Sequence, residues 1–151
     1  MQVTHKPITN YVLGFAFSKS GELVLLICKN KPEWQRGRYN GIGGKIAPGE
    51  HPDAAMSREF LEETGVAVPP THWTSFAELR GPDYHVWVYY TFLSDDAFRG
   101  ARTTTDEEII KTGISYAIKH RAVLPNLRWL LPAALGAREN KFGMTVTYYG
   151  E

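Results

Sequence analysis

Several features are scarce or missing in this chain of 151 residues. It has one cysteine, Cys28, so no disulfide can form within the chain, and a reducing compartment is expected. No apolar run approaches the roughly 18 residues that a membrane-spanning helix needs. The first ten residues, MQVTHKPITN, lack the apolar segment of a secretory signal. These absences predict a cytoplasmic protein that does not enter a membrane.

An excess of charge of one sign is also missing. Lys and Arg number 17 and Asp and Glu number 16, which gives a formal net charge of +1. Domains that bind nucleic-acid polymers commonly carry a strongly basic surface, so this composition does not favour that class of partner. The chain has no repeats or low-complexity linkers, and its hydrophobic content of 43% can form a core. We therefore expect one domain over residues 1–151, as a monomer or a homodimer.

Apolar runs separated by turn residues predict a mixed sheet with helices on both faces, an α/β fold. The expected strands are residues 11–17, 23–28, 39–46, 73–79, 85–93, 114–118 and 141–149. The expected helices are residues 52–64 and 125–138, the second with leucines at helical spacing. The polar segments 30–38 and 94–105 are expected to be loops.

The first of these helices carries an unusual arrangement of acids. Pro52 suits a first helical turn and Gly65 suits a helix end. Between them, Glu59, Glu62 and Glu63 share one face near the negative end of the helix dipole. Like charges at these spacings cost about 0.2–0.5 kcal/mol per pair. Because clustered carboxylates are ligands for hard divalent cations, the arrangement favours a site for Mg²⁺ or Mn²⁺.

The acids belong to a longer pattern within the stretch GKIAPGEHPDAAMSREFLEETGV. Its residues are Gly44, Glu50, Arg58-Glu59-Phe60, Glu62-Glu63 and Gly65-Val66. This pattern resembles the Nudix box, the signature of the Nudix hydrolases, with Phe60 where that family usually has an aliphatic residue. The resemblance implies an α/β/α sandwich. It also implies an enzyme that cleaves, with a divalent metal ion, the diphosphate of a nucleoside diphosphate linked to another group.

The resemblance also implies roles for the residues of the box. Glu59 and Glu63 match metal ligands, and Glu62 matches either a ligand or a residue that orients the attacking water. Gly44 matches a position whose backbone carbonyl can reach the metal. The general base differs between family members and is left open here.

Residues around these acids are expected to support them. Arg58 and Glu50 match an ion pair, with Arg58 off the acid face of the helix. Lys45 is either a phosphate ligand or simply an exposed lysine. Many relatives add a carboxylate from a later loop; within Asp106-Glu107-Glu108 we favour Glu107, the alternative being a solvated acidic loop.

The nucleobase site is less strongly indicated. The run Arg38-Tyr39-Asn40-Gly41 resembles the approach to the box in MutT-like triphosphatases that act on oxidised purine nucleotides, which makes Asn40 the expected base reader. Those relatives also carry acids between two prolines near the C-terminus, where this chain has Asn126 and Leu127. This departure weakens the case for an oxidised-purine specialist. Asn126 is still a candidate for substrate binding, and Trp129 nearby is a candidate for stacking on a base.

Three functions follow, in order of preference. The first is a nucleoside triphosphate pyrophosphohydrolase acting on normal or modified nucleotides, to give a monophosphate and diphosphate. Pro82 and Tyr84 keep open a hydrolase of ADP-ribose or of dinucleoside polyphosphates. A non-catalytic nucleotide sensor is disfavoured because a sensor does not need the unfavourable acid cluster.

Overall fold

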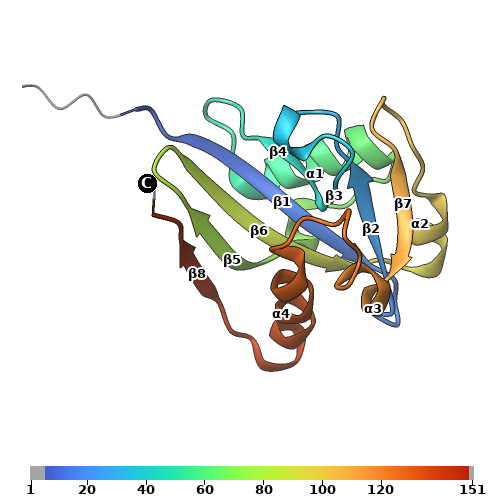
Figure 1. The fold of residues 1–151 in the computed structure, drawn as a ribbon. Coiled ribbons are helices and arrows are strands. Elements are labelled where there is room, and N and C mark those ends of the chain that lie inside the picture. The colour runs from blue at the N-terminus through green and yellow to red at the C-terminus, as the bar shows by residue number, and fades with distance from the viewer. Residues whose placement is uncertain (1–5, 150–151) are drawn as a thin grey trace, which may run out of the picture.

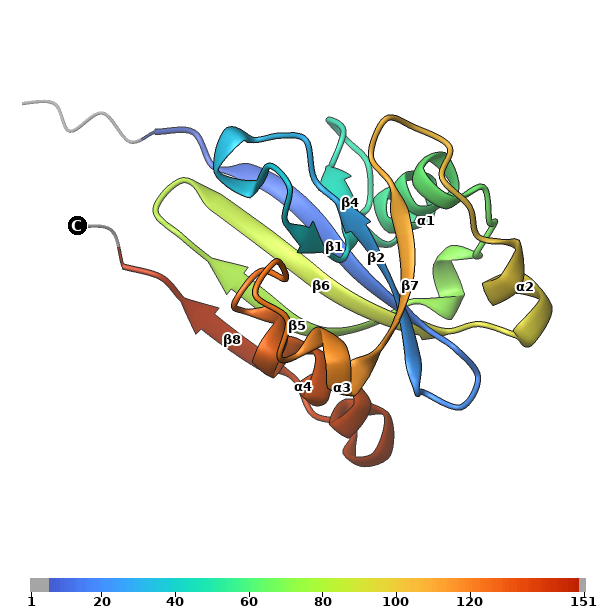
Figure 2. The same cartoon turned by 45° about the vertical axis from the view of Figure 1, so that its right-hand side comes forward.

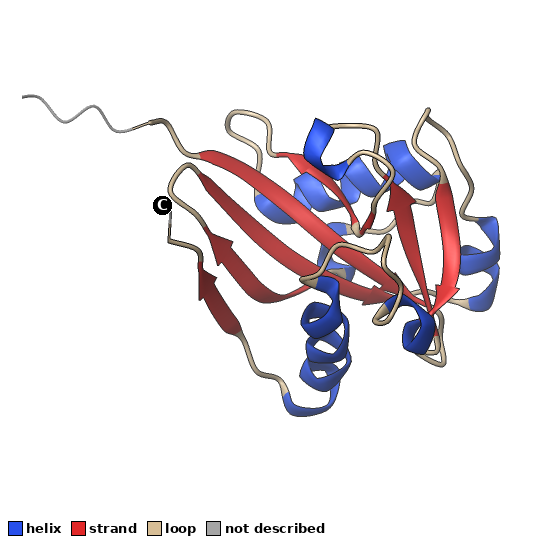
Figure 3. Cartoon of the chain, viewed as in Figure 1, coloured by secondary structure: helices blue, strands red, loops and turns tan. Residues whose placement is uncertain are grey.

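The structure is a computed structural model, and it describes residues 6–149 as one eight-stranded mixed sheet flanked by helices (Figures 1 and 3). The strands are β1 (Thr9–Phe17), β2 (Leu23–Cys28), β3 (Tyr39–Asn40), β4 (Ile42–Lys45), β5 (Thr74–Arg80), β6 (Tyr84–Phe92), β7 (Ile109–Gly113) and β8 (Met144–Thr147). The helices are α1 (Pro52–Thr64), α2 (Asp95–Gly100), α3 (Ile114–Ala117) and α4 (Leu127–Asn140). Residues 1–5, half of the N-terminal stretch used to exclude a secretory signal, lie outside the described part.

The strand order places β1 at the centre of the sheet (Figure 2). The hydrogen-bonded order is β3-β2-β1-β6-β5-β8, with β4 paired to β1 and β7 paired to β2. The pairs β1–β6 and β5–β8 are parallel, and the other pairs are antiparallel. The segment 39–46, expected to be one strand, is therefore two short strands that pair with different neighbours on either side of Gly41.

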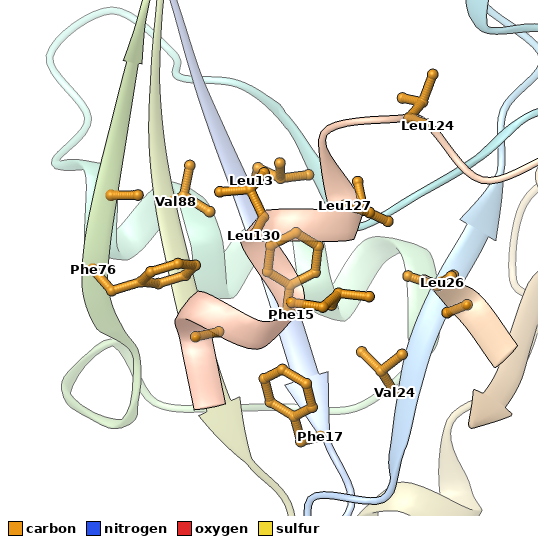
Figure 4. Close-up of a cluster of buried hydrophobic side chains, with 14 of the residues drawn as sticks. Leu13, Phe15, Phe17, Val24, Leu26, Phe76, Val88, Leu124, Leu127 and Leu130 are labelled. Carbon is orange, nitrogen blue, oxygen red and sulfur yellow. The ribbon is translucent and has the colours of Figure 1, made fainter. Parts of the chain in front are cut away.

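Each face of the sheet buries its own hydrophobic core. Along β1, alternate side chains go to opposite faces, as the period of a strand requires. Leu13, Phe15 and Phe17 pack under α4, and Figure 4 shows them facing the leucines of that helix. Val12 and Ala16 belong to the second core, which α1 covers. The expected α/β/α layering is confirmed.

Helix α1 has the bounds that the sequence predicts. It begins at Pro52, where His51 accepts a hydrogen bond from the Asp53 N–H, and it ends at Gly65, whose φ of 75° is left-handed. Met56 and Phe60 are fully buried against the sheet. None of the helices among residues 6–149 is long and apolar enough to cross a membrane.

Two expectations about later segments are wrong. Part of the expected loop 94–105 is helix α2, in which Ser94 caps the N-terminus and Phe98 is buried. The expected strand 114–118 is instead helix α3, because the chain pairs with β2 earlier, over Ile109–Gly113, and turns away from the sheet at Gly113.

Candidate active site

The close approach of α1 to β4 defines the site. The register of β4 on β1 pairs Gly44 with Val12. A Cβ atom added at Gly44 would lie 2.6 Å from the carboxyl carbon of Glu59. The absence of a side chain at position 44 is therefore what allows a carboxylate of α1 to lie against the backbone of the strand.

We expect Gly44→Ala to disturb the site much more than the fold. Its methyl group would displace the Glu59 carboxylate, which is the movable end of a side chain, so activity should fall at least about tenfold, as when a residue that orients a metal ligand is lost. Steady-state kinetics and thermal melting measure the two effects.

Substitutions at two other glycines serve as controls for Gly44→Ala. At Gly100 an added Cβ meets nothing within 4 Å, so Gly100→Ala is the matched control that should keep full activity. At Gly43 the Cβ would lie 1.9 Å from the Val12 carbonyl oxygen, so Gly43→Ala should destabilise the fold itself. Wild-type activity in Gly44→Ala would contradict the assignment of this contact to the site.

The three acids of α1 occupy different environments. Glu59 is the most enclosed, with 13% of its side chain exposed, and its Oε1 accepts a hydrogen bond of 3.0 Å from Arg58 Nη1. Glu63 is half-buried, whereas 55% of the Glu62 side chain is exposed. Burial raises the pKa of both Glu59 and Glu63, and neighbouring carboxylates raise it further. The site thus holds two desolvated acids whose charged forms are disfavoured.

Arg58 ties the loop before α1 to the helix. Its Nε and Nη2 atoms each lie 2.9 Å from a carboxylate oxygen of Glu50, a two-point ion pair. This contact with Arg58 is the main reason that the pKa of Glu50 falls to about 2. Arg58 Nη2 also donates to the carbonyl of Lys45, at 3.1 Å.

The predicted ion pair between Arg58 and Glu50 is therefore present, but the expectation that Arg58 stays off the acid face is wrong. The long side chain turns back along the helix, and Nη1 reaches Glu59 and also Glu62, at 3.4 Å. Leu61, next to the buried Phe60, is 48% exposed.

Glu107 is brought to the site by the segment that precedes β7. Only 7% of the residue is exposed, and its Oε2 accepts a hydrogen bond of 2.6 Å from the Asn30 N–H. Its Oε1 lies 3.2 Å from Lys29 Nζ. The charge of Glu107 contributes to the raised pKa of Glu63, so the two carboxylates are within electrostatic reach.

Glu107, the acid that the sequence analysis favours, is the buried one of the three acids in that loop. Asp106 and Glu108 are exposed, so the solvated-loop alternative holds for them and fails for Glu107. Sequence reasoning missed Lys29. Its only signal is a cation directly after a buried strand, and many surface lysines share that signal.

The donor set of the site suits a hard divalent cation. It consists of the carboxylates of α1, which are oxygen ligands of the kind that Mg²⁺ and Mn²⁺ prefer. Within residues 6–149, no three acidic, imidazole or thiol side chains converge on one point. Glu59 accepts a hydrogen bond from Arg58 through its Oε1, and Glu63 accepts one from Thr105 through its Oε2.

Asn40, the residue expected to bind the nucleobase, lies in β3, which is joined to the segment before α4. The backbone of Tyr39 in β3 bonds to Ala122 and Leu124, which brings Asn40 towards the start of α4. Asn40 is half-buried, and its Oδ1 accepts a hydrogen bond of 2.8 Å from the Gly41 N–H.

The other expected substrate contacts differ in how enclosed they are. Asn126 stands just before α4, and its buried Oδ1 accepts no hydrogen bond from any residue in the described range. Trp129 is 37% exposed on the first turn of α4. Lys45 is exposed beside the acids, so its side chain is free to reach a ligand or solvent.

Comparison with known proteins finds relatives in sequence and in fold. The family model described as the NUDIX domain matches residues 8–139. The mouse (Mus musculus) oxidized purine nucleoside triphosphate hydrolase is 33% identical over 89 residues, which cover 55% of this chain. That match spans about half (53%) of the length of the mouse protein.

Solved structures agree in fold. A MutT protein from Bacillus halodurans superposes with a TM-score of 0.71 at 14% identity, covering 94% of this chain and 90% of that one. A NUDIX hydrolase from Nitrosomonas europaea has a TM-score of 0.70 at 15% identity, covering 99% of this chain and 83% of the other. At such low identity these neighbours establish the fold and nothing further.

Proposed function

The chain belongs to the NUDIX family, and from that premise we propose that it is a metal-dependent pyrophosphohydrolase. Its substrate is a nucleoside triphosphate, normal or modified, and its products are the monophosphate and diphosphate. The observation that carries the proposal is the pair of desolvated acids, Glu59 and Glu63, beside the close backbone approach at Gly44. The name of the mouse relative supports the substrate class. We further propose a single domain over residues 1–151, working in the cytoplasm.

Glu59 and Glu63, with the backbone carbonyl of Gly44, are the proposed ligands of Mg²⁺ or Mn²⁺. When bound, the cation neutralises charge on the diphosphate and helps to orient its oxygens for attack by water. Keeping both carboxylates ionised without a cation is costly, because burial disfavours their charged forms. A cation at this position therefore relieves an electrostatic penalty that the fold itself imposes.

The remaining polar residues have separable roles in this proposal. Arg58 donates a hydrogen bond to Glu59, and it holds the loop before α1 through its ion pair with Glu50. Its proposed role is therefore to position the metal ligands, without taking part in the reaction. Glu62, the most exposed of the three acids, is placed to contact the attacking water or complete the ligand set. Glu107 faces Glu63 from the other side and serves as a further ligand or as the base.

Recognition of the nucleoside is assigned to residues of β3 and of the start of α4. Asn40 presents an amide, which both donates and accepts hydrogen bonds and can therefore read a purine edge. Asn126, whose buried Oδ1 has no hydrogen-bond partner among residues 6–149, is a second candidate for contact with the base, and Trp129 offers an aromatic face. Lys45 is assigned to the phosphates.

We expect Asn40→Ala to change base preference more than turnover. Loss of one hydrogen bond to the base should raise KM for the preferred nucleotide about tenfold, equivalent to about 1.4 kcal/mol, with kcat largely unchanged. Steady-state kinetics on a panel of purine and pyrimidine triphosphates, ADP-ribose and dinucleoside polyphosphates measures both quantities.

The same panel tests the proposed function in the wild-type protein. Asn140→Ala, at the exposed end of α4, is the matched control and should leave every constant unchanged. An identical ranking of bases in wild type and Asn40→Ala would remove Asn40 from the site. Turnover confined to ADP-ribose or dinucleoside polyphosphates would replace the proposed substrate class.

A further inference from the structure

The segment between α2 and β7 runs along the C-terminal end of α1 and is fastened to it. The Arg102 N–H donates to the Thr64 carbonyl, at 3.0 Å. The Thr104 hydroxyl donates to the carbonyl of Glu62. Thr105 Oγ1 lies 3.2 Å from a carboxylate oxygen of Glu63. Three contacts in four residues thus hold this segment against the turn that carries the acids.

The hydroxyl of Thr105 differs from the other contacts because it joins an acidic side chain of α1 to the backbone of Glu107 in its own segment. Its oxygen accepts a hydrogen bond of 3.1 Å from the Glu107 N–H. Its single proton is then free to point to Glu63 Oε2, at 3.2 Å, which is closer than the Glu107 carbonyl at 3.5 Å. An ionised carboxylate can only accept hydrogen bonds, so the direction of this bond is fixed.

We propose that Thr105 is a positioning residue that holds Glu63 of α1 and the backbone of Glu107 in one arrangement through its hydroxyl. The inference rests on the proposed function and deepens it, because it names a residue that sets the geometry of the acids without reacting. Such outer contacts orient metal ligands in proteins, and their loss commonly weakens metal binding.

The neighbouring threonines show why the role falls on Thr105. Among the described residues, Thr103 Oγ1 accepts a hydrogen bond from the Ile109 N–H, at 3.0 Å, and Thr104 bonds to a backbone carbonyl. Both contacts shape the backbone, and neither reaches an acidic side chain. Thr103 is therefore a matched control: the same residue type, two positions away, equally exposed, with a hydrogen bond of its own to lose.

The test compares Thr105→Val, which keeps the shape and removes the hydroxyl, with Thr105→Ser, which keeps the hydroxyl. Thr105→Ala is a second variant without the hydroxyl, and Thr103→Val is the control. Calorimetric titration with Mn²⁺ alone gives metal affinity without turnover, and kinetics on a purine triphosphate give kcat and KM. Circular dichroism and melting verify the fold.

Thr105→Val and Thr105→Ala should weaken Mn²⁺ binding by about tenfold, which is the smaller of the losses usually seen when a residue that orients a metal ligand is removed. Both variants should lower kcat more than they raise KM. Thr105→Ser should restore binding to near the wild-type value. Thr103→Val should leave Mn²⁺ affinity unchanged even where it lowers the melting temperature.

Wild-type affinity and kcat in both variants without the hydroxyl would overturn the inference while the proposed function stands. So would equal losses of affinity in Thr105→Val and Thr103→Val, because the loop as a whole would then be responsible. A wild-type protein that neither binds Mn²⁺ nor hydrolyses the nucleotide would overturn the proposed function itself, and this inference with it.

Discussion

Glu63→Gln is expected to lower kcat for nucleoside triphosphate hydrolysis by about a hundredfold or more, beyond the usual cost of losing an outer-shell partner. The substitution keeps the size of the side chain and removes its charge, so it removes a proposed metal ligand without opening a cavity. Steady-state kinetics at saturating Mg²⁺ measure the effect.

The same variant should fold at least as well as the wild type without metal. Burial raises the pKa of Glu63, so the folded state disfavours the charge that glutamine lacks. Glu139→Gln, on the exposed last turn of α4, is the matched control and should keep full activity. If Glu63→Gln retained wild-type kcat, Glu63 would have no place in the catalytic site.

Mg²⁺ or Mn²⁺ should raise the melting temperature of the protein. At a free concentration of about 100 times Kd, a ligand that binds only the folded state stabilises it by about 2.7 kcal/mol. For a chain of this size that corresponds to a rise of about 5–10 °C. Melting followed by circular dichroism across a metal titration measures it, and the rise should shrink in Glu63→Gln. A melting curve that does not move, together with calorimetry that shows no binding, would exclude a metal site.

This stabilisation should depend on pH in a defined direction. The pKa values of Glu59 and Glu63 are raised above 4.5 in the folded protein. Their contribution to stability without metal is therefore fully present below pH 4.5 and is lost as the pH rises through the folded values. Metal competes with protons for the same oxygens, so the metal-induced rise in melting temperature should grow over that window. A metal effect larger at pH 4 than at pH 7 would contradict this linkage.

Local sequence signals were sufficient for α1 because its ends are set by local chemistry. Proline at the first turn and glycine in the left-handed conformation at the end fix the bounds independently of the rest of the fold. The apolar runs that predict strands over residues 11–17 and 23–28 likewise correspond to β1 and β2. The short helix α2 also has such signals, Ser94 at its cap and two acids in its first turn, and these could have found it.

Other features depend on contacts between distant segments and had no local signal. Glu107 is buried because Lys29 and Asn30, nearly 80 positions earlier, meet its carboxylate. Thr105 reaches Glu63 for a similar reason, across 42 positions. Arg58 departs from its predicted direction because a long side chain can turn back towards two acids, which a helical wheel does not represent.

In the proposed reaction the acids of α1 help to split a nucleoside triphosphate into the nucleoside monophosphate and inorganic pyrophosphate. The most direct test separates the products by ion-exchange chromatography after incubation of the wild-type protein with purine triphosphates and Mg²⁺. We predict that nucleoside monophosphate and inorganic pyrophosphate appear in equal amounts. Neither product should appear when a chelator removes Mg²⁺. Release of nucleoside diphosphate and orthophosphate, or no turnover of any triphosphate with Mg²⁺ or Mn²⁺, would contradict the claim.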